Sequence, residues 1–275
     1  MDYIPATSPA EVLATLADGQ AQVLAGGQSL FFADPPRRVV DINRVAEFEV
    51  LTEVDGTLRV GPLVRHRTFE TDAVAGPLGD LLRVVVRHIG HPPVRARGTM
   101  VGSLAYAHPA AEWTVVAMIL DASLELSSPG GSRTVPAARF FTGAGTTARR
   151  PDELLSGVLL PQLPPGTGVG YAEDRRGPGI WAYAATMTAV TMVDDVVTAA
   201  AIGLVNAGPC PVRARDAERA LIGTTFSDTA ITAAANAAAA EVADDDRRRA
   251  VHVLTRRALT QAREGSYQGS WLSAR

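Results

Sequence analysis

The fold of this chain is indicated by two glycine-bearing turns. The first reads Ala25-Gly26-Gly27-Gln28-Ser29-Leu30, and the second reads Arg97-Gly98-Thr99-Met100-Val101-Gly102-Ser103-Leu104. Glycine readily adopts positive φ angles, so a glycine pair after an apolar strand lets successive backbone N–H groups converge on an anion. We interpret the turns as a matched pair of phosphate-binding loops, although a single Gly-Gly pair more often forms a plain turn.

The composition is that of an ordinary globular enzyme. The 275 residues are 47% hydrophobic and 20% charged, with a formal charge of −3, and this length predicts two or three domains. No basic cluster is larger than Arg247-Arg248-Arg249, so we exclude nucleic acid as a partner. The sequence has no apolar run near the roughly 20 residues of a membrane span and no signal-peptide pattern. We therefore expect a cytoplasmic protein that does not bind membranes.

The basic and sulfur-containing residues exclude two kinds of chemistry. All 26 basic side chains are arginine, since the sequence contains no lysine, and this excludes Schiff-base catalysis. Cys210 is the single cysteine, which is too few for a disulfide within the chain or an iron–sulfur cluster. His88 and His91 lack a third ligand nearby, so we expect no metal site.

We predict three domains, 1–46, 47–165 and 166–275. The first is a small α/β layer with a helix over 9–18 and strands over 21–24 and 38–41. The second has a hairpin around Asp55-Gly56 and further helices and strands, over 78–89, 109–120, 122–126 and 154–159. The third is α+β, with a hairpin and three helices, over 183–193, 196–206, 213–221, 228–242 and 245–262.

Several further segments show a family resemblance. They are His88–Ala122, which contains the second turn, and the segments 39–44, 61–67, 150–155 and 208–218. With the two turns, they resemble the FAD-binding medium subunit of the carbon monoxide dehydrogenase and xanthine dehydrogenase family. The resemblance implies an α+β fold, with a PCMH-type FAD-binding fold in two subdomains followed by a C-terminal α+β domain with an antiparallel sheet and helices.

The same resemblance implies a cofactor and partners. In the family the two turns hold the FAD pyrophosphate, and the flavin passes electrons to iron–sulfur and molybdenum subunits. The residues of this chain that match the FAD loops are Gly26, Gly27, Gln28, Ser29, Leu30, Thr99, Gly102 and Ser103.

Four stretches depart from the family pattern near the expected cofactor cleft. Val101 replaces a glycine, and a β-branched residue is disfavoured at positive φ. The segment Phe31–Pro36 is shorter than in the family. His108 and Ile180 each stand where the family usually has an acid.

From these departures we favour a stand-alone biosynthetic enzyme that needs no cofactor and could form a homo-oligomer. The former flavin cleft would be an apolar pocket for the non-redox cyclisation or rearrangement of a small apolar molecule, with His108 and Tyr106 as catalytic residues. The predicted substrate-binding residues are Phe31, Phe32, Val101, Ile180 and Trp181. Two alternatives remain open: an FAD-binding electron-transfer subunit of a molybdenum-containing enzyme, and a non-catalytic ligand-binding or scaffold subunit.

Overall fold

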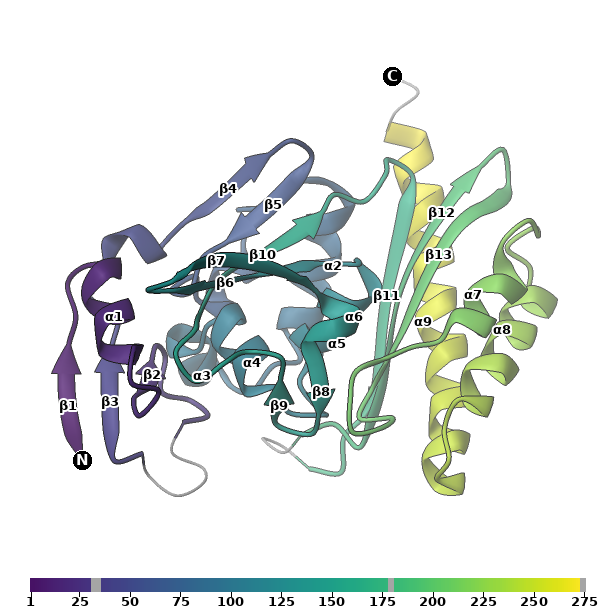
Figure 1. Ribbon diagram of the computed structural model, residues 1–275. Coiled ribbons are helices and arrows are strands. Elements are labelled where there is room, and N and C mark those ends of the chain that lie inside the picture. The colour runs from purple at the N-terminus through teal and green to yellow at the C-terminus, as the bar shows by residue number, and fades with distance from the viewer. Residues whose placement is uncertain (31–35, 178–180, 273–275) are drawn as a thin grey trace. The chain divides into compact units, whose positions relative to one another are not determined.

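The computed structural model describes residues 1–30, 36–177 and 181–272, with side chains up to residue 265 (Figure 1). Its contacts divide the chain into two compact units, each assembled from three segments. The first unit comprises Met1–Thr68, His91–His108 and Asp121–Pro161, and the second comprises Phe69–Gly90, Pro109–Leu120 and Gln162–Arg275. The predicted division into 1–46, 47–165 and 166–275 stays an interpretation of the sequence.

A small parallel sheet lies at the N-terminal end of the first unit. Its order is β1-β3-β2, and its elements are β1 (Asp2–Pro5), β2 (Gln22–Leu24) and β3 (Arg38–Asp41). Helix α1 (Pro9–Leu16) begins after Ser8, whose side chain accepts a hydrogen bond from the Glu11 N–H. The helix packs Val12 and Leu16 against Val40 of the sheet.

A five-stranded antiparallel sheet forms the larger part of this unit, in the order β4-β5-β10-β6-β7. Its strands are β4 (Leu51–Val54), β5 (Thr57–Val60), β6 (Ser123–Ser128), β7 (Gly131–Pro136) and β10 (Leu154–Pro161). Asp55 and Gly56, both at positive φ, connect β4 to β5 as the sequence predicts. The remaining elements are short: η1 (Ala46–Phe48), α3 (Pro92–Arg97), α4 (Met100–Tyr106), α6 (Ala137–Phe140), β8 (Phe141–Gly143) and β9 (Thr146–Thr147). A further short 3-10 helix, η2 (His66–Glu70), begins in the first unit.

The second unit is built on a four-stranded antiparallel sheet of order β11-β12-β13-β14. The strands are β11 (Thr167–Asp174), β12 (Ala184–Val193), β13 (Val196–Val205) and β14 (Val212–Arg213). Three helices share one core with Ile202 and Leu204 of β13: α7 (Arg215–Leu221), α8 (Asp228–Ala240) and α9 (Asp245–Leu272). Figure 1 shows α9 running along β11 and β12.

Two helices cover the other face of that sheet. They are α2 (Gly76–Val86), which contacts β11, and α5 (Glu112–Ile119), which contacts β13. Gly203 explains how closely α5 approaches, since a Cβ at this position would lie 2.3 Å from Cγ1 of Val115. The predicted helix start at Pro109 was wrong by three residues, because α5 begins at Glu112 after an extended Ala111.

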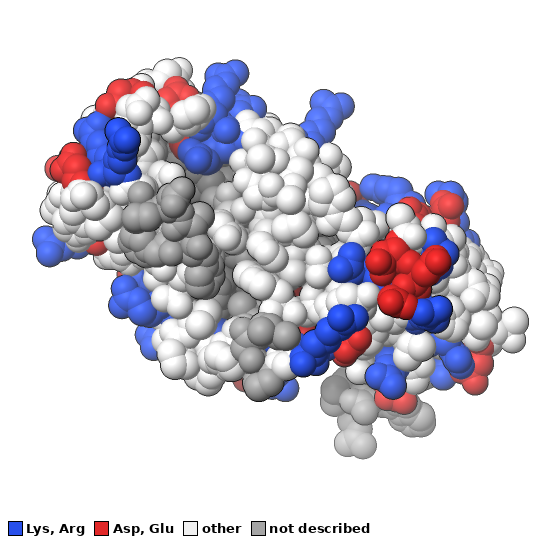
Figure 2. Space-filling model, turned by 90° about the horizontal axis from the view of Figure 1, so that it is seen from below, with Lys and Arg blue, Asp and Glu red and all other residues white. Residues whose placement is uncertain are grey.

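The observed fold is α+β with antiparallel sheets and helices, as predicted. Acidic and basic side chains occur next to each other on the face in Figure 2, so this face shows no large field of one sign. Within the described ranges, no helix combines the length and the apolar character needed to cross a membrane.

Candidate functional site

The first glycine turn follows β2 and is held against the second turn. Gly27 has φ +70°, the left-handed conformation that favours glycine. At Gly26, a Cβ would lie 2.2 Å from the carbonyl oxygen of Arg97, so no other residue fits without moving the main chain. The Gln28 side chain donates a hydrogen bond to the Gly26 carbonyl at 3.2 Å. The two turns are therefore neighbours in the first unit, as the interpretation of a matched pair requires.

The second turn is packed against a buried histidine. A Cβ at Gly98 would lie 2.6 Å from the His66 ring, and the His66 N–H donates to the Gly98 carbonyl at 2.9 Å. Burial, together with the positive charges of Arg95 and Arg65, lowers the pKa of His66 to about 3. His66 is therefore neutral near pH 7, and the turn lies against an uncharged ring.

After Gly98 the chain forms a helix rather than the predicted loop. Thr99 is the N-cap of α4, and its hydroxyl accepts a hydrogen bond from the Gly102 N–H at 3.0 Å. Val101 lies in the first turn of this helix, 3% exposed, and is not among the residues at positive φ. The argument from a positive φ at Val101 was wrong, because the backbone there is helical and accepts valine. The predicted place of its side chain in a substrate pocket stays a prediction.

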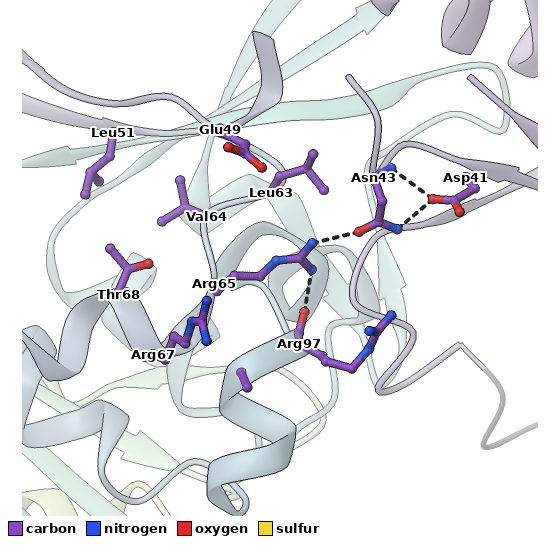
Figure 3. A pocket seen from close by; sticks show the side chains of 11 residues that line it. Asp41, Asn43, Glu49, Leu51, Leu63, Val64, Arg65, Arg67, Thr68 and Arg97 are labelled. Carbon is purple, nitrogen blue, oxygen red and sulfur yellow. Dashed lines mark hydrogen bonds between the residues drawn. The ribbon is translucent and has the colours of Figure 1, made fainter. Parts of the chain in front are cut away.

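One arginine connects the two turns (Figure 3). Arg65 donates from Nη1 to the Arg97 carbonyl at 2.5 Å and from Nη2 to Oδ1 of Asn43 at 2.7 Å. Asn43 in turn donates from Nδ2 to the Ala25 carbonyl at 2.8 Å. Asn43 is itself fixed by Asp41, whose Oδ1 accepts from its backbone and side-chain nitrogens at 2.9 and 2.6 Å. The hydrogen-bonded path Ala25–Asn43–Arg65–Arg97 therefore joins one turn to the other.

Arg65 also faces a pocket of about 630 Å³ in the first unit. The lining residues are Asp41, Asn43, Glu49, Leu51, Leu63, Val64, Arg65, Arg67, Thr68, Ala96 and Arg97. Figure 3 shows the guanidinium group of Arg65 between those of Arg67 and Arg97. Burial and the neighbouring charge of Arg97 lower the pKa of Arg65. The arrangement concentrates positive charge on one side of the pocket.

The predicted catalytic pair follows α4. The rings of Tyr106 and His108 are stacked, with centroids 6.0 Å apart and an angle of 5° between their planes. Ala107 between them has φ +50° and ends the helix. Burial lowers the pKa of His108, which favours the neutral imidazole. A role for either residue in acid or base catalysis stays a prediction.

The predicted apolar pocket stays a prediction, because its five residues are not all described within one unit. Phe31, Phe32 and Ile180 lie outside the described residues. Trp181 belongs to the second unit and is 41% exposed, whereas Val101 is buried in the first. The remaining loop residues, Ser29, Leu30 and Ser103, are partly buried in the two turns.

A second group of charged side chains lies within the second unit. Glu173 on β11 is 3.0 Å from Nδ1 of His88 and 2.9 Å from Nη2 of Arg175. Burial opposes the charge of Glu173, but these two hydrogen bonds outweigh it and lower the pKa of the carboxyl group. Within the run 173–176, the side chains of Glu173 and Arg175 are only 17% and 18% exposed, whereas Asp174 and Arg176 are exposed. The run is therefore only partly a solvated face.

Glu112 is the most perturbed acid of this group. It begins α5, is 3% exposed, and lies 3.9 Å from Arg175. Burial outweighs the attraction of Arg175 and raises the pKa of Glu112 to about 8. Among the described residues, no group of three or more His, Cys, Asp or Glu side chains is placed to hold a metal ion.

The comparisons with known proteins identify the family of the chain. Residues 1–163 match the FAD binding domain in molybdopterin dehydrogenase, and residues 170–262 match the CO dehydrogenase flavoprotein C-terminal domain. The chain belongs to the medium-subunit family of carbon monoxide and xanthine dehydrogenases. This confirms the family to which the sequence motifs pointed.

Three similar proteins illustrate the family. The 6-hydroxypseudooxynicotine dehydrogenase complex subunit alpha of Paenarthrobacter nicotinovorans is 36% identical over 86% of this chain and 83% of its own length. The carbon monoxide dehydrogenase medium chain of Hydrogenophaga pseudoflava is 32% identical, over 89% and 88%. A solved structure of quinoline 2-oxidoreductase from Pseudomonas putida 86 has a TM-score of 0.89 and 29% identity, covering 97% of this chain and 98% of the other.

Sequence reasoning missed the residues that connect the turns. Asn43 lies in the segment 39–44 and Arg65 in 61–67, both of which carry the family resemblance. No periodicity or local spacing indicates that these two side chains meet, because the hydrogen bond between them spans 22 residues. The sequence signal that could have indicated Asn43 was the family resemblance of the segment 39–44, which continues directly after the predicted strand 38–41.

Proposed function

We propose that this chain is the FAD-binding subunit of a molybdenum-containing hydroxylase or dehydrogenase. The observation that carries the proposal is the direct contact of the two glycine turns at Gly26 and Arg97. The family description names FAD, and similar chains are named as subunits of dehydrogenases. The FAD-binding electron-transfer subunit, given above as an alternative, is therefore the function that we propose.

The residues of the two turns fit the diphosphate of FAD. Gly27 at φ +70° gives the first turn a conformation in which backbone N–H groups can face an anion, and Ser29 and Ser103 add hydroxyl donors. The guanidinium groups of Arg65, Arg67 and Arg97 line the pocket beside the second turn. This donor set suits a dianionic group. The residues that would hold FAD are those of the turns: Gly26, Gly27, Gln28, Ser29, Leu30, Thr99, Gly102 and Ser103.

The work of this chain would be to bind and orient the cofactor. Bound FAD supplies an isoalloxazine ring that accepts and releases electrons. Arg65 and Asn43 would fix the spacing of the turns, and the cap at Thr99 would fix the start of α4. Cys210 alone cannot ligate an iron–sulfur cluster, so iron–sulfur and molybdenum centres would belong to partner chains.

The hypothesis of a stand-alone cyclase rested on four departures near the cofactor cleft. Val101 is accommodated in a helix and no longer supports it. The departures at Phe31–Pro36 and Ile180 fall on residues outside the described ranges and stay untested, and His108 stands as before. A stand-alone activity also has no support among the similar proteins, which include subunits of dehydrogenases and of a hydroxylase.

The experiment is a titration of the purified full-length chain with FAD. Tight stoichiometric binding, seen as quenching of flavin fluorescence and a yellow protein after gel filtration, is the expected result. Co-expression with neighbouring genes for iron–sulfur and molybdenum subunits should then yield a complex that contains this chain. Failure of the wild-type chain to bind FAD, alone or in that complex, would overturn the proposal.

A further inference from the structure

Gly98 in the second turn is needed for its small size and not for its backbone conformation. Its φ of −59° and ψ of 150° are angles that any residue adopts. A Cβ on Gly98, however, would lie 2.6 Å from both Cδ2 and Nε2 of His66 and 3.1 Å from the Val94 carbonyl oxygen. One edge of the imidazole ring therefore faces Gly98, and the ring sets how closely the second turn can approach.

The main chain joins the same two segments, 64–66 and 98–100. The His66 N–H donates to the Gly98 carbonyl at 2.9 Å, and the Met100 N–H donates to the Val64 carbonyl at 3.3 Å. The middle residues of the two segments form an antiparallel bridge. Because α4 begins at Met100, the segment that carries His66 holds the start of this helix as well as the turn before it.

The surroundings of His66 exclude a charged imidazole ring. The residue is 5% exposed. Helix α3 contributes the positive charge of Arg95, the neighbouring Arg65 contributes a second, and α4 has no Arg, Asp, Glu or His in its sequence. Burial first, and then these two charges, lower the pKa of His66 to about 3. A proton on the buried ring would add a third positive charge, so protonation requires the ring to reach water.

We propose that His66 is a positioning residue of the second turn, and that the turn stays closed only while its imidazole ring is neutral. The neutral ring is the buried surface on which the main chain of Gly98 is packed. Opening of the turn exposes the ring, and an imidazole in water takes up a proton below about pH 6.5. Acid therefore favours the opened turn over the closed one.

The size of the effect follows from the two states of the ring. The pKa of His66 is about 3 in the closed turn and 6.5 without burial. The opened fraction is therefore nearly constant above pH 6.5 and increases as the pH falls, by about 30-fold between pH 7.5 and pH 5. Glu112 of the second unit acts in the opposite direction, since burial raises its pKa and its contribution to stability is lost as the pH rises.

One consequence rests on the proposed function. If FAD leaves when the second turn opens, its dissociation should accelerate over the same pH range, by up to about 30-fold. Equilibrium affinity should change less, because the closed turn remains the main state of the free chain. Hydrogen exchange of the free chain needs no cofactor and tests His66 separately.

The test is hydrogen exchange of the full-length chain over the peptide 97–104, corrected for the pH dependence of exchange in an unfolded chain. The protection of this peptide in the wild type should fall by about 30-fold from pH 7.5 to pH 5. His66→Gln removes the titrating ring and should lose this pH dependence, whatever its protection at a single pH. His252→Gln is the matched control, since this half-buried histidine lies on α9 in the second unit, and it should keep the wild-type profile.

A double-mutant cycle tests whether the ring itself positions the turn. Gly98→Ala should lower the protection of the peptide 97–104 at neutral pH, because the added Cβ meets the ring. In a His66→Ala chain the ring is gone, and the same glycine substitution should cost about fivefold less protection. A histidine that is only buried nearby would give additive effects.

The outcomes separate this inference from the proposed function. Equal pH profiles in the wild type and His66→Gln would overturn the inference, as would additive effects in the cycle. A profile that depends on His66 in a chain that does not bind FAD would support the inference and overturn the proposed function. Acid-accelerated FAD dissociation that disappears in His66→Gln would support both.

Discussion

Arg65 in the first unit and Arg175 in the second occupy opposite electrostatic surroundings. Arg175 lies 2.9 Å from Glu173 and 3.9 Å from Glu112, whereas Arg65 meets a carbonyl and an amide oxygen. A cation matched by carboxylates contributes to the fold and has little positive potential left. A cation held by neutral acceptors keeps its potential for a ligand. From this difference we expect a structural role for the second group and a binding role for the first.

The comparison also bears on Glu112 of the second unit, an acid whose pKa is raised by burial. Burial of the Arg175 group from water favours neutral forms, and Glu112, the most buried acid there, has the raised pKa. We expect substitutions in this group to change how stability depends on pH. Substitutions around Arg65 should instead change ligand affinity and local opening of the turns.

The largest effect is expected for Gly26→Ala. The new Cβ would lie 2.2 Å from the Arg97 carbonyl oxygen, so the two turns must separate, at a cost of about 4 kcal/mol. Hydrogen exchange of peptides covering 25–30 and 97–104 should accelerate, and FAD affinity should fall. Gly130→Ala is the control, because the nearest atom there is 3.7 Å away. Equal behaviour of the two variants would show that the close contact is not real.

The next effect is expected for Glu112→Gln. The pKa of Glu112 is about 8 in the folded chain and 4.5 when the side chain is not buried, as in the unfolded chain. The free energy of unfolding therefore includes the full contribution of Glu112 below about pH 4.5 and decreases as the pH rises toward 8. The loss is on the order of 3 kcal/mol, and the glutamine variant should not show it. Urea unfolding at about pH 5 and pH 8.5, followed by the fluorescence of the neighbouring Trp113, measures the difference.

A control for the pH experiment is Glu241→Gln, which changes an exposed acid at the end of α8. Its profile should match that of the wild type, and neither variant should alter FAD affinity. A wild-type stability that does not fall between these pH values would contradict the protonated state of Glu112. A loss of FAD affinity in Glu112→Gln would contradict the division of roles between the two groups.

For Val101→Gly we expect a loss of about 2 kcal/mol in stability, from the removed buried side chain and the added backbone freedom. Because the position is already helical, FAD affinity should stay within about threefold of wild type. Val101→Ala separates the two causes, since it removes most of the side chain without adding the backbone freedom of glycine. An increase in FAD affinity of tenfold or more in the glycine variant would show that Val101 obstructs the cofactor.

The smallest effect is expected for Asn43→Ala, at about 1.5 kcal/mol, because it removes the hydrogen bonds to Ala25 and Arg65. Hydrogen exchange over 25–30 should accelerate, while peptides of the second unit stay unchanged. Asn236→Ala on the exposed side of α8 is the control and should leave both regions as in wild type. Unchanged exchange in Asn43→Ala would remove Asn43 from the path between the turns.

Local sequence signals predicted much of the fold. The Ser8 cap, the Asp55-Gly56 turn and the long hairpin of β12 and β13 were recognised because each depends on neighbouring residues. Helix α4 was missed because Gly98 and Gly102 suggested a loop, although Thr99 was a capping residue directly before it. A Cβ at Gly102 would lie 2.7 Å from the Thr99 hydroxyl, so the glycine leaves room for the cap in this conformation.

The site was predictable only in part. The two turns and their glycines were identified from the sequence, and the family resemblance implied FAD as the group that they bind. The pocket was not, because Asn43, Arg65 and Arg97 come from separate segments and converge only after the parallel and antiparallel sheets are in place. Burial likewise decided that Glu173 and Arg175 form an internal pair, which a run of charges does not reveal.

The main chain and the side chain of Arg97 have different contacts. Its main-chain carbonyl contacts Gly26 and accepts the hydrogen bond from Arg65, whereas its side chain lines the pocket. Any amino acid except proline supplies the same backbone groups there, so the side chain can be exchanged without dismantling the joint between the turns. The ligand preference of this pocket is therefore open to redesign by a library at a single codon.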